Sequence, residues 1–235
     1  RQEEALSSTV ARVVTLLGGE STGKTSLAQA LCDRLNRRGL ATHLVPEYLR
    51  QWCEKQGRAP RADEQAELAR TQAQLIDEAT TRQDVQVVLA DTTPLVIAAY
   101  SELYFMDTGL LPAARDWQRR ADLTLLMGLD LPWVSDGFFR DSEAIRDATD
   151  AVLRRELHLA GIAFQTIYGQ GPDRLEQALR VLGRALGQDL VAPNLDWPQG
   201  RRPWSCEKCS DPDCEHRLFS NLLAVSYTHL TLPTS

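Results

Sequence analysis

The sequence lacks the features that mark membrane, secreted or nucleic-acid-binding proteins. In its 235 residues no apolar run approaches the roughly 18 residues of a membrane span, and residues 1–9 lack the apolar stretch of a signal peptide. Basic residues are not in excess, since 26 Lys and Arg stand against 32 Asp and Glu. A general binder of nucleic acid or membrane surfaces would carry a basic footprint. We therefore expect a cytoplasmic protein that acts on a small molecule rather than on nucleic acid or a membrane.

Cysteine is also scarce, and it is unevenly placed. Three of the five cysteines crowd near the C-terminus. An odd count in this distribution is typical of reduced thiols and a metal site rather than of a disulfide framework. Cys206, Cys209, Cys214 and His216 supply four ligands of the types that zinc prefers, and the first two have the spacing of a zinc knuckle. We predict a structural zinc site there, with free surface cysteines or a redox-active pair as the alternatives.

Short apolar runs alternate with longer segments of helical periodicity, which is the pattern of a parallel α/β sheet. The content of hydrophobic residues, 43%, is ordinary for a globular chain. The apolar runs predict strands at residues 10–17, 41–45, 85–90, 122–127 and 162–168. The helical patterns predict helices at residues 24–38, 47–56, 62–82, 94–105, 142–160 and 173–186.

A glycine-rich segment follows the first predicted strand. Residues 18–25 read GGESTGKT and fit the phosphate-loop pattern G-x-x-x-x-G-K-[ST]. The glycines let backbone N–H groups cradle phosphate oxygens, while Lys24 reaches the β- and γ-phosphates and Thr25 can ligate magnesium. The positive end of the following helix adds to this attraction. The residues predicted to bind ATP are Gly18, Gly19, Glu20, Ser21, Thr22, Gly23, Lys24, Thr25 and Ser26.

Asp91 ends the third apolar run. An acid at the carboxyl end of a buried strand can hold magnesium, directly or through water, as the Walker-B residue of P-loop proteins does. The alternative is that Asp91 caps the helix predicted to begin near Pro94. We favour the magnesium role, so that Thr25 and Asp91 together form the predicted Mg²⁺ site.

These features predict an α/β fold of the P-loop NTPase type, with three layers and a five-stranded parallel sheet. We assign residues 10–187 to this domain. Residues 188–224 form a short extension rich in Pro and Cys, which contains the candidate zinc site. Residues 225–235 share no pattern with the preceding chain, and we interpret them as a foreign or disordered tail.

Glu47 follows the second predicted strand by one residue after Pro46. Ligands of open α/β sheets bind outside the carboxyl ends of the strands, so Glu47 is placed to orient or deprotonate an acceptor hydroxyl. Arg50 lies one helical turn further and could share that face. The alternative for both is a surface ion pair at a helix start.

Basic side chains after the fourth and fifth strands are candidates for contact with the nucleotide. Arg140 follows Gly137 in a predicted lid, where it can stabilise the charge that spreads over a transferring phosphoryl group. For Arg146 and the pair at 154–155 we favour a solvated basic face. Arg174 follows a Gly-Gln-Gly-Pro turn, and we predict that it stacks on adenine, although a plain turn explains the pattern nearly as well.

The segments that carry these residues resemble the ribosylnicotinamide kinase domain of NadR-type proteins, a branch of the P-loop nucleoside kinases. They read GGESTGKTSLAQAL, VPEYLR, ADTTPLVIAAYSELYF, LPWVSDGFFR and GQGPDR, and the resemblance covers residues 10–186. It implies that the strand of Asp91 lies beside the phosphate-loop strand. It also implies ATP and magnesium as the donor and the 5′-hydroxyl of nicotinamide riboside as the acceptor, a step of NAD salvage. Glu47 stands in the place of the family's acceptor-side acid, and Arg140 in that of its lid arginine.

Two functional hypotheses follow from the sequence. The first is an ATP-dependent kinase of a nucleoside-like small molecule, with Lys24, Glu47, Asp91 and Arg140 as its catalytic residues. The second is a regulatory P-loop NTPase or nucleotide-sensing module that acts on a macromolecular partner. The two differ in what attacks the γ-phosphate, which is a bound hydroxyl in the first and water in the second.

Overall fold

Five parallel strands form the middle layer of the fold. The computed structural model describes residues 10–134 and 142–191, and its strands run side by side in the order β2-β3-β1-β4-β5. The strands are β1 (Arg12–Leu17), β2 (Thr42–Val45), β3 (Val87–Asp91), β4 (Leu123–Met127) and β5 (Gln165–Ile167). Leu16 of β1 is in register with Asp91 of β3, so both strands end at the same edge of the sheet.

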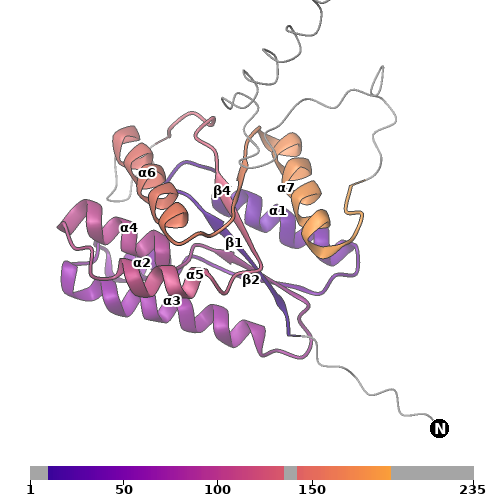
Figure 1. Cartoon of the computed structure of the whole chain (residues 1–235), viewed down its shortest axis with the longest axis horizontal. Helices are drawn as coiled ribbons and strands as arrows, with labels where there is room; N and C mark the ends of the chain where they lie inside the picture. Colours follow the sequence, from indigo (N-terminus) through magenta and orange to yellow (C-terminus); the bar gives the residue numbers. More distant parts are fainter. Residues whose placement is uncertain (1–9, 135–141, 192–235) are drawn as a thin grey trace, which may run out of the picture.

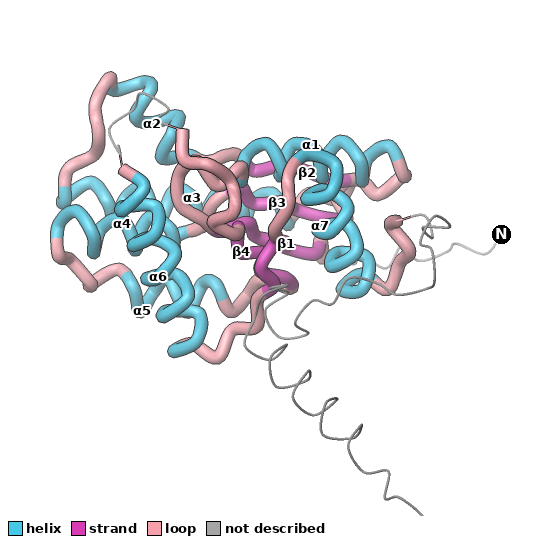
Figure 2. The backbone as a smooth tube through the Cα atoms, turned by 90° about the horizontal axis from the view of Figure 1, so that it is seen from above, coloured by secondary structure: helices cyan, strands magenta, loops and turns pink. Residues whose placement is uncertain are grey.

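Helices cover both faces of the sheet. They are α1 (Lys24–Arg37), α2 (Tyr48–Gln56), α3 (Gln65–Thr80), α4 (Pro94–Phe105), α5 (Leu111–Gln118), α6 (Glu143–Leu159) and α7 (Gly171–Leu186), with a short 3-10 helix at Ala62–Glu64 before α3. Figures 1 and 2 show α1 and α7 together on one side of the strands and α2 to α6 on the other. The result is a three-layer α/β/α arrangement.

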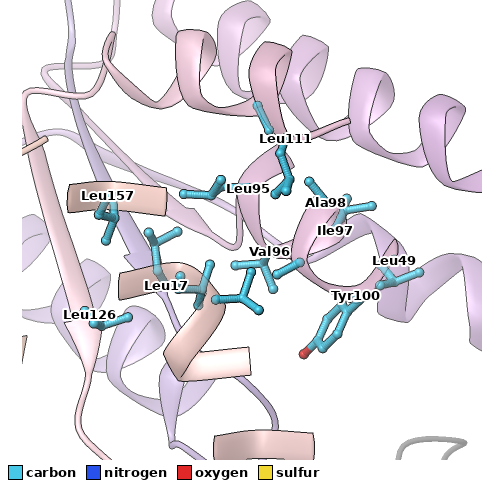
Figure 3. Close-up of a cluster of buried hydrophobic side chains, with 14 of the residues drawn as sticks. Leu17, Leu49, Leu95, Val96, Ile97, Ala98, Tyr100, Leu111, Leu126 and Leu157 are labelled. Atoms are coloured by element: carbon cyan, nitrogen blue, oxygen red, sulfur yellow. The ribbon is translucent and has the colours of Figure 1, made fainter. Parts of the chain in front are cut away.

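The largest apolar cluster on the α2–α6 side is built around α4, and Figure 3 shows it. The segment from Pro94 to Ser101 is buried on every side, because α4 lies between α3, α5 and α6. A helix with that environment must be apolar all round, as the sequence LVIAAY is. Leu17 and Leu126, from the ends of β1 and β4, pack against α4 and so tie the phosphate-loop strand to this core.

The predicted fold class is confirmed, since every predicted strand and helix is present and the sheet is parallel with five strands. The boundaries differ in places. Residues 162–164 precede β5 instead of forming its first half, and residues 85 and 86 precede β3, which ends at Asp91 as predicted. The helix α5 was not predicted. It is short, and its buried apolar residues Leu111, Ala114 and Trp117 are spaced at helical intervals.

Several predictions concern residues outside the described part of the chain. Arg140 and Gly137 are among them, as are the candidate zinc ligands Cys206, Cys209, Cys214 and His216 and the proposed boundary between residues 224 and 225. Within residues 10–134 and 142–191, no helix is both long and apolar enough to cross a membrane.

Candidate active site

The phosphate loop connects the end of β1 to the start of α1. Two of its glycines have backbone angles that favour glycine: Gly18 has φ 155° and Gly23, the N-cap of α1, has φ 70°. A Cβ on Gly18 would also lie 2.9 Å from the Thr22 hydroxyl. That hydroxyl donates a hydrogen bond of 2.7 Å to the carbonyl of Gly19, which closes the loop. The sequence therefore dictates a tight turn whose end is the N-terminus of a 14-residue helix.

The rest of the predicted ATP-binding segment lies around this turn. Lys24 is buried, whereas Thr25 and Ser26 are exposed on the first turn of α1 and Glu20 is partly buried. Ser21 has φ 56° and bonds the main chain of Val134. Because Val134 follows β4, this contact joins the loop to the chain segment that precedes the predicted lid.

Lys24 is the centre of charge in the site. Its Nζ lies 3.1 Å from Oδ1 of Asp91 and 3.3 Å from Oε2 of Glu47. The side chain of Lys24 is 7% exposed and that of Asp91 2%. Burial opposes the charge of Lys24, but the carboxylates of Glu47 and Asp91 outweigh it and raise the pKa of Lys24 above its ordinary value. Lys24 is therefore held as a cation between Asp91 at the end of β3 and Glu47 at the start of α2.

Asp91 does not cap a helix. The N-cap of α4 is Thr93, whose hydroxyl accepts a hydrogen bond from the Leu95 N–H. This excludes the helix-capping interpretation of Asp91. The buried Oδ1 of Asp91 is instead held in the ion pair with Lys24, 3.1 Å from its Nζ. An oxygen of this kind at the phosphate edge of the sheet suits a hard cation, for which carboxylate and hydroxyl oxygens are the preferred ligands.

The donor set therefore fits magnesium at Asp91 and Thr25, provided that phosphate and water complete the shell. Within the described residues, no group of three or more His, Cys, Asp or Glu side chains is arranged to hold a metal ion. Mg²⁺ in kinase sites usually takes only one or two protein carboxylates and keeps substrate oxygens and waters.

Glu47 is the N-cap residue of α2, yet its side chain makes no capping hydrogen bond. The carboxylate instead turns to Lys24. Arg50, which was expected on the same face, is about half exposed and pairs with Glu54 at 3.7 Å. The structure therefore brings Glu47 into the site and places Arg50 in a surface ion pair.

Arg146 corrects one sequence-based interpretation. We expected a solvated basic face, but Arg146 is 5% exposed and lies against the phosphate loop, where a Cβ on Gly19 would approach its Cα at 3.3 Å. Its guanidinium donates to the carbonyl of Leu131 at 2.9 Å and pairs with Glu143 and Asp147. Arg146 therefore links the start of α6 to the segment after β4. The only sequence signal was its place one turn after the predicted N-terminus of that helix.

The other arginines of α6 make structural ion pairs. Arg154 binds Asp150 at 2.7 Å, and Arg155 binds Glu102 of α4 through both ends of its guanidinium. Arg155 also pairs with Glu156, which is 1% exposed and accepts a second bond from Arg115. These ion pairs connect α4, α5 and α6 to one another, and none of them involves a residue of the phosphate loop.

Arg174 is buried beneath the loop after β5. Its guanidinium donates to the carbonyls of Gly169, Gly128 and Ile167 at 3.2–3.4 Å. Burial lowers the pKa of Arg174, while the nearby Asp130 acts in the opposite direction. These contacts give Arg174 a function in fixing the ends of β4 and β5. Stacking on adenine stays a prediction.

Sequence reasoning missed a strained residue beside Asp91. Thr92 is fully buried and has φ 86°, a conformation that costs a β-branched residue about 1–3 kcal/mol. Its neighbour Thr93 donates to Gln118 of α5, whose amide in turn donates to Thr15 and Thr124 of the central strands. This buried network fixes the chain just after Asp91. Positive φ at a threonine leaves no mark in the sequence.

Comparison with solved structures gives P-loop proteins of related architecture. A NadR protein in complex with NR matches with a TM-score of 0.67 at 24% identity, over 80% of this chain and 54% of that one. A NadR protein in complex with NAD and AMP-PNP matches with a TM-score of 0.64 at 23% identity, over 80% of this chain and 52% of that one. The chain thus spans about half the length of these NadR proteins. The likeness confirms the fold expected from the resemblance to NadR-type kinase domains.

Thymidylate kinase from Ehrlichia chaffeensis also matches, with a TM-score of 0.53 at 14% identity, over 74% of this chain and all of that one. A search of curated protein sequences gives no match. Among protein families, the model described as an AAA domain matches residues 13–174, which include the phosphate loop, Asp91 and Arg174. The match extends over most of the sequence, and the chain therefore belongs to the AAA domain family.

Proposed function

We propose that this protein transfers a phosphoryl group from ATP to the hydroxyl of a small nucleoside-like acceptor, and that nicotinamide riboside is the acceptor. The observation that carries the proposal is the contact between Lys24 of the phosphate loop and Glu47 at the start of α2. A carboxylate within 3.3 Å of the phosphate-binding lysine lies where an acceptor hydroxyl must approach the γ-phosphate. A carboxylate at this place can also activate water, so the dependence of ADP release on an acceptor is what separates a kinase from a hydrolase.

In the proposed phosphoryl transfer, each residue of the site has a separate role. The loop N–H groups and the cationic Lys24 bind the phosphates and offset the charge that develops on them. Glu47 orients the acceptor hydroxyl and takes its proton as the oxygen attacks phosphorus, while the bond from phosphorus to the ADP oxygen breaks. Asp91 and Thr25 would hold magnesium, which when bound neutralises negative charge on the phosphates. In the chain as it stands, Lys24 pairs with both acids, so phosphate binding replaces contacts that the lysine already makes.

Support for the choice of acceptor comes from the fold and from the sequence segments. One solved NadR structure contains NR and another contains AMP-PNP, and both share this fold. The segments around Glu47 and Asp91 are those that resemble the ribosylnicotinamide kinase domain. The fold alone does not choose among nucleosides, because thymidylate kinase shares it as well. A panel of acceptors is therefore the decisive experiment.

The test is ADP release from ATP and Mg²⁺ with a panel of nucleosides that includes nicotinamide riboside. We expect strong stimulation by nicotinamide riboside, and none in Lys24→Ala. Glu47→Gln should keep its affinity for ATP and lose about 10²–10⁴-fold in acceptor-dependent turnover, the usual contribution of a general base. Glu54→Gln, an exposed acid on the same helix, is the matched control and should behave as the parent protein.

Two results would count against the proposal. ADP release that no acceptor changes would favour the regulatory NTPase, in which water attacks the γ-phosphate. Full acceptor phosphorylation by Glu47→Gln would remove Glu47 from the mechanism while leaving the kinase activity in place. Stimulation by a different nucleoside would retain the kinase and replace nicotinamide riboside as its acceptor.

A further inference from the structure

A buried glutamine on α3 holds the chain on both sides of Glu47. The Tyr48 N–H donates to Oε1 of Gln72 at 2.8 Å, and Nε2 of Gln72 donates to the carbonyl of Pro46 at 3.3 Å. Gln72 has no exposed surface. One amide side chain, 24 residues away in sequence, therefore uses both of its ends to bind the residues that flank the acid.

This arrangement explains why Glu47 is available for the site. An N-cap side chain usually turns back to accept a hydrogen bond from the first N–H groups of its own helix. Glu47 makes no such bond, and Gln72 supplies the acceptor for the N–H of Tyr48, the first residue of α2. One N–H at the start of α2 is thus satisfied by Gln72 of α3. The Glu47 carboxylate points toward Lys24 of the phosphate loop.

Gln72 is itself firmly anchored. Leu68 and Ile76 lie one helical turn before and after it on α3, and each is at most 2% exposed. The two belong to different apolar clusters, Leu68 to the one around α4 and Ile76 to the one against β2 and β3. A polar side chain between two such anchors has little rotational freedom. Its amide therefore fixes the position of the segment 46–48 relative to the sheet.

We infer that Gln72 is a positioning residue, which sets the place of Glu47 relative to Lys24 and so the rate of phosphoryl transfer to the acceptor. The inference rests on the proposed kinase function. A catalytic group that moves by about 1 Å can lose on the order of 100-fold in rate. The main-chain segment that carries Glu47 is held through Gln72, so loss of the two hydrogen bonds acts first on the position of Glu47 and through it on the acceptor step.

The test compares Gln72→Leu with Gln74→Leu, the same substitution two residues away at an exposed site. Gln72→Leu keeps most of the side-chain volume and removes both hydrogen bonds. We expect acceptor-dependent kcat to fall about 10- to 100-fold, with the Kd for ATP within about twofold of the parent value. Gln72→Glu keeps the acceptor for Tyr48 but, when ionised, cannot donate to Pro46, and should give an intermediate kcat. Gln74→Leu should match the parent protein.

A double-mutant comparison separates positioning from a general loss of structure. If Gln72 acts through Glu47, then adding Gln72→Leu to Glu47→Gln should lower kcat little further, because the acid is already absent. A second loss as large as the first would overturn the inference, since it would show an effect that does not pass through Glu47. An unchanged kcat in Gln72→Leu alone would overturn it equally.

Amide hydrogen exchange gives a readout that needs no activity. Exchange at Tyr48 should be faster in Gln72→Leu than in the parent protein and unchanged in Gln74→Leu, because the Tyr48 N–H loses its acceptor. Equal exchange in all three proteins would overturn the inference whatever the kinetics. If the parent protein shows no acceptor-dependent turnover, the proposed function fails, and the exchange comparison still decides whether Gln72 holds this segment.

Discussion

Replacement of Lys24 by methionine should destabilise the protein, apart from its effect on catalysis. Lys24 is 7% exposed and faces the carboxylates of Asp91 and Glu47, which are 2% and 12% exposed. Methionine retains the length of the side chain but leaves two acids beside each other with no counter-charge. Removal of one partner from a buried ion pair usually costs about 3–5 kcal/mol. We expect a loss of that size, mostly from Asp91, because it is the more deeply buried acid.

The assay is thermal and urea unfolding in the absence of nucleotide. For a domain of this size, 1 kcal/mol corresponds to about 2–4 °C in Tm, so Lys24→Met should lower Tm by about 6–20 °C. Lys55→Met, at an exposed position of α2, is the control and should change Tm by less than about 2 °C. Adding Asp91→Asn to Lys24→Met should recover part of the loss, since it removes one unpaired charge. A Tm of Lys24→Met equal to that of Lys55→Met would refute the role of Lys24 as counter-charge.

Three other predictions concern stability. Gln118→Leu leaves buried hydroxyls without their partner, and urea unfolding should show a loss of at least about 1–3 kcal/mol. In α7, Gly183→Ala should lower Tm despite the better helix propensity of alanine, because the new Cβ would lie 2.5 Å from the backbone oxygen of Gln188. The Arg58 guanidinium lowers the pKa of Glu64 to about 2, so the stabilisation is present above the ordinary pKa of about 4.3 and is lost as the pH falls toward 2. Glu64→Gln should therefore have a lower urea midpoint than the parent at pH 7, and the two midpoints should converge near pH 2.

The fold and the tight turn at residues 18–25 were predictable because their signals are local. The apolar run of β1, the glycines after it and the helix that follows occupy consecutive positions, and the pattern places Lys24 without knowledge of distant contacts. Glu47 and Asp91 were also predictable, although they are far apart in sequence. Both stand at the carboxyl ends of parallel strands, and those ends share one edge of the sheet.

The features that escaped prediction depend on partners in distant elements. Helical periodicity marks the apolar stripe of α6, but it cannot show that Arg146 becomes buried where that helix begins beside Gly19. A glutamine in a helical pattern usually predicts an exposed side chain. Gln72 is a hydrogen-bond partner of Tyr48 only because α3 packs against the start of α2. Gln118 is another case, since its three partners come from three separate elements.

The balance of charge around Lys24 bears on the need for a metal. One lysine faces two carboxylates, so this group of side chains carries an excess of negative charge before any nucleotide binds. Arg146 does not offset that excess, because it already pairs with Glu143 and Asp147. A nucleoside triphosphate adds further negative charge at the same place, where burial weakens screening by water. From the charges of the described residues, we therefore expect Mg²⁺ to strengthen nucleotide binding in the proposed mode.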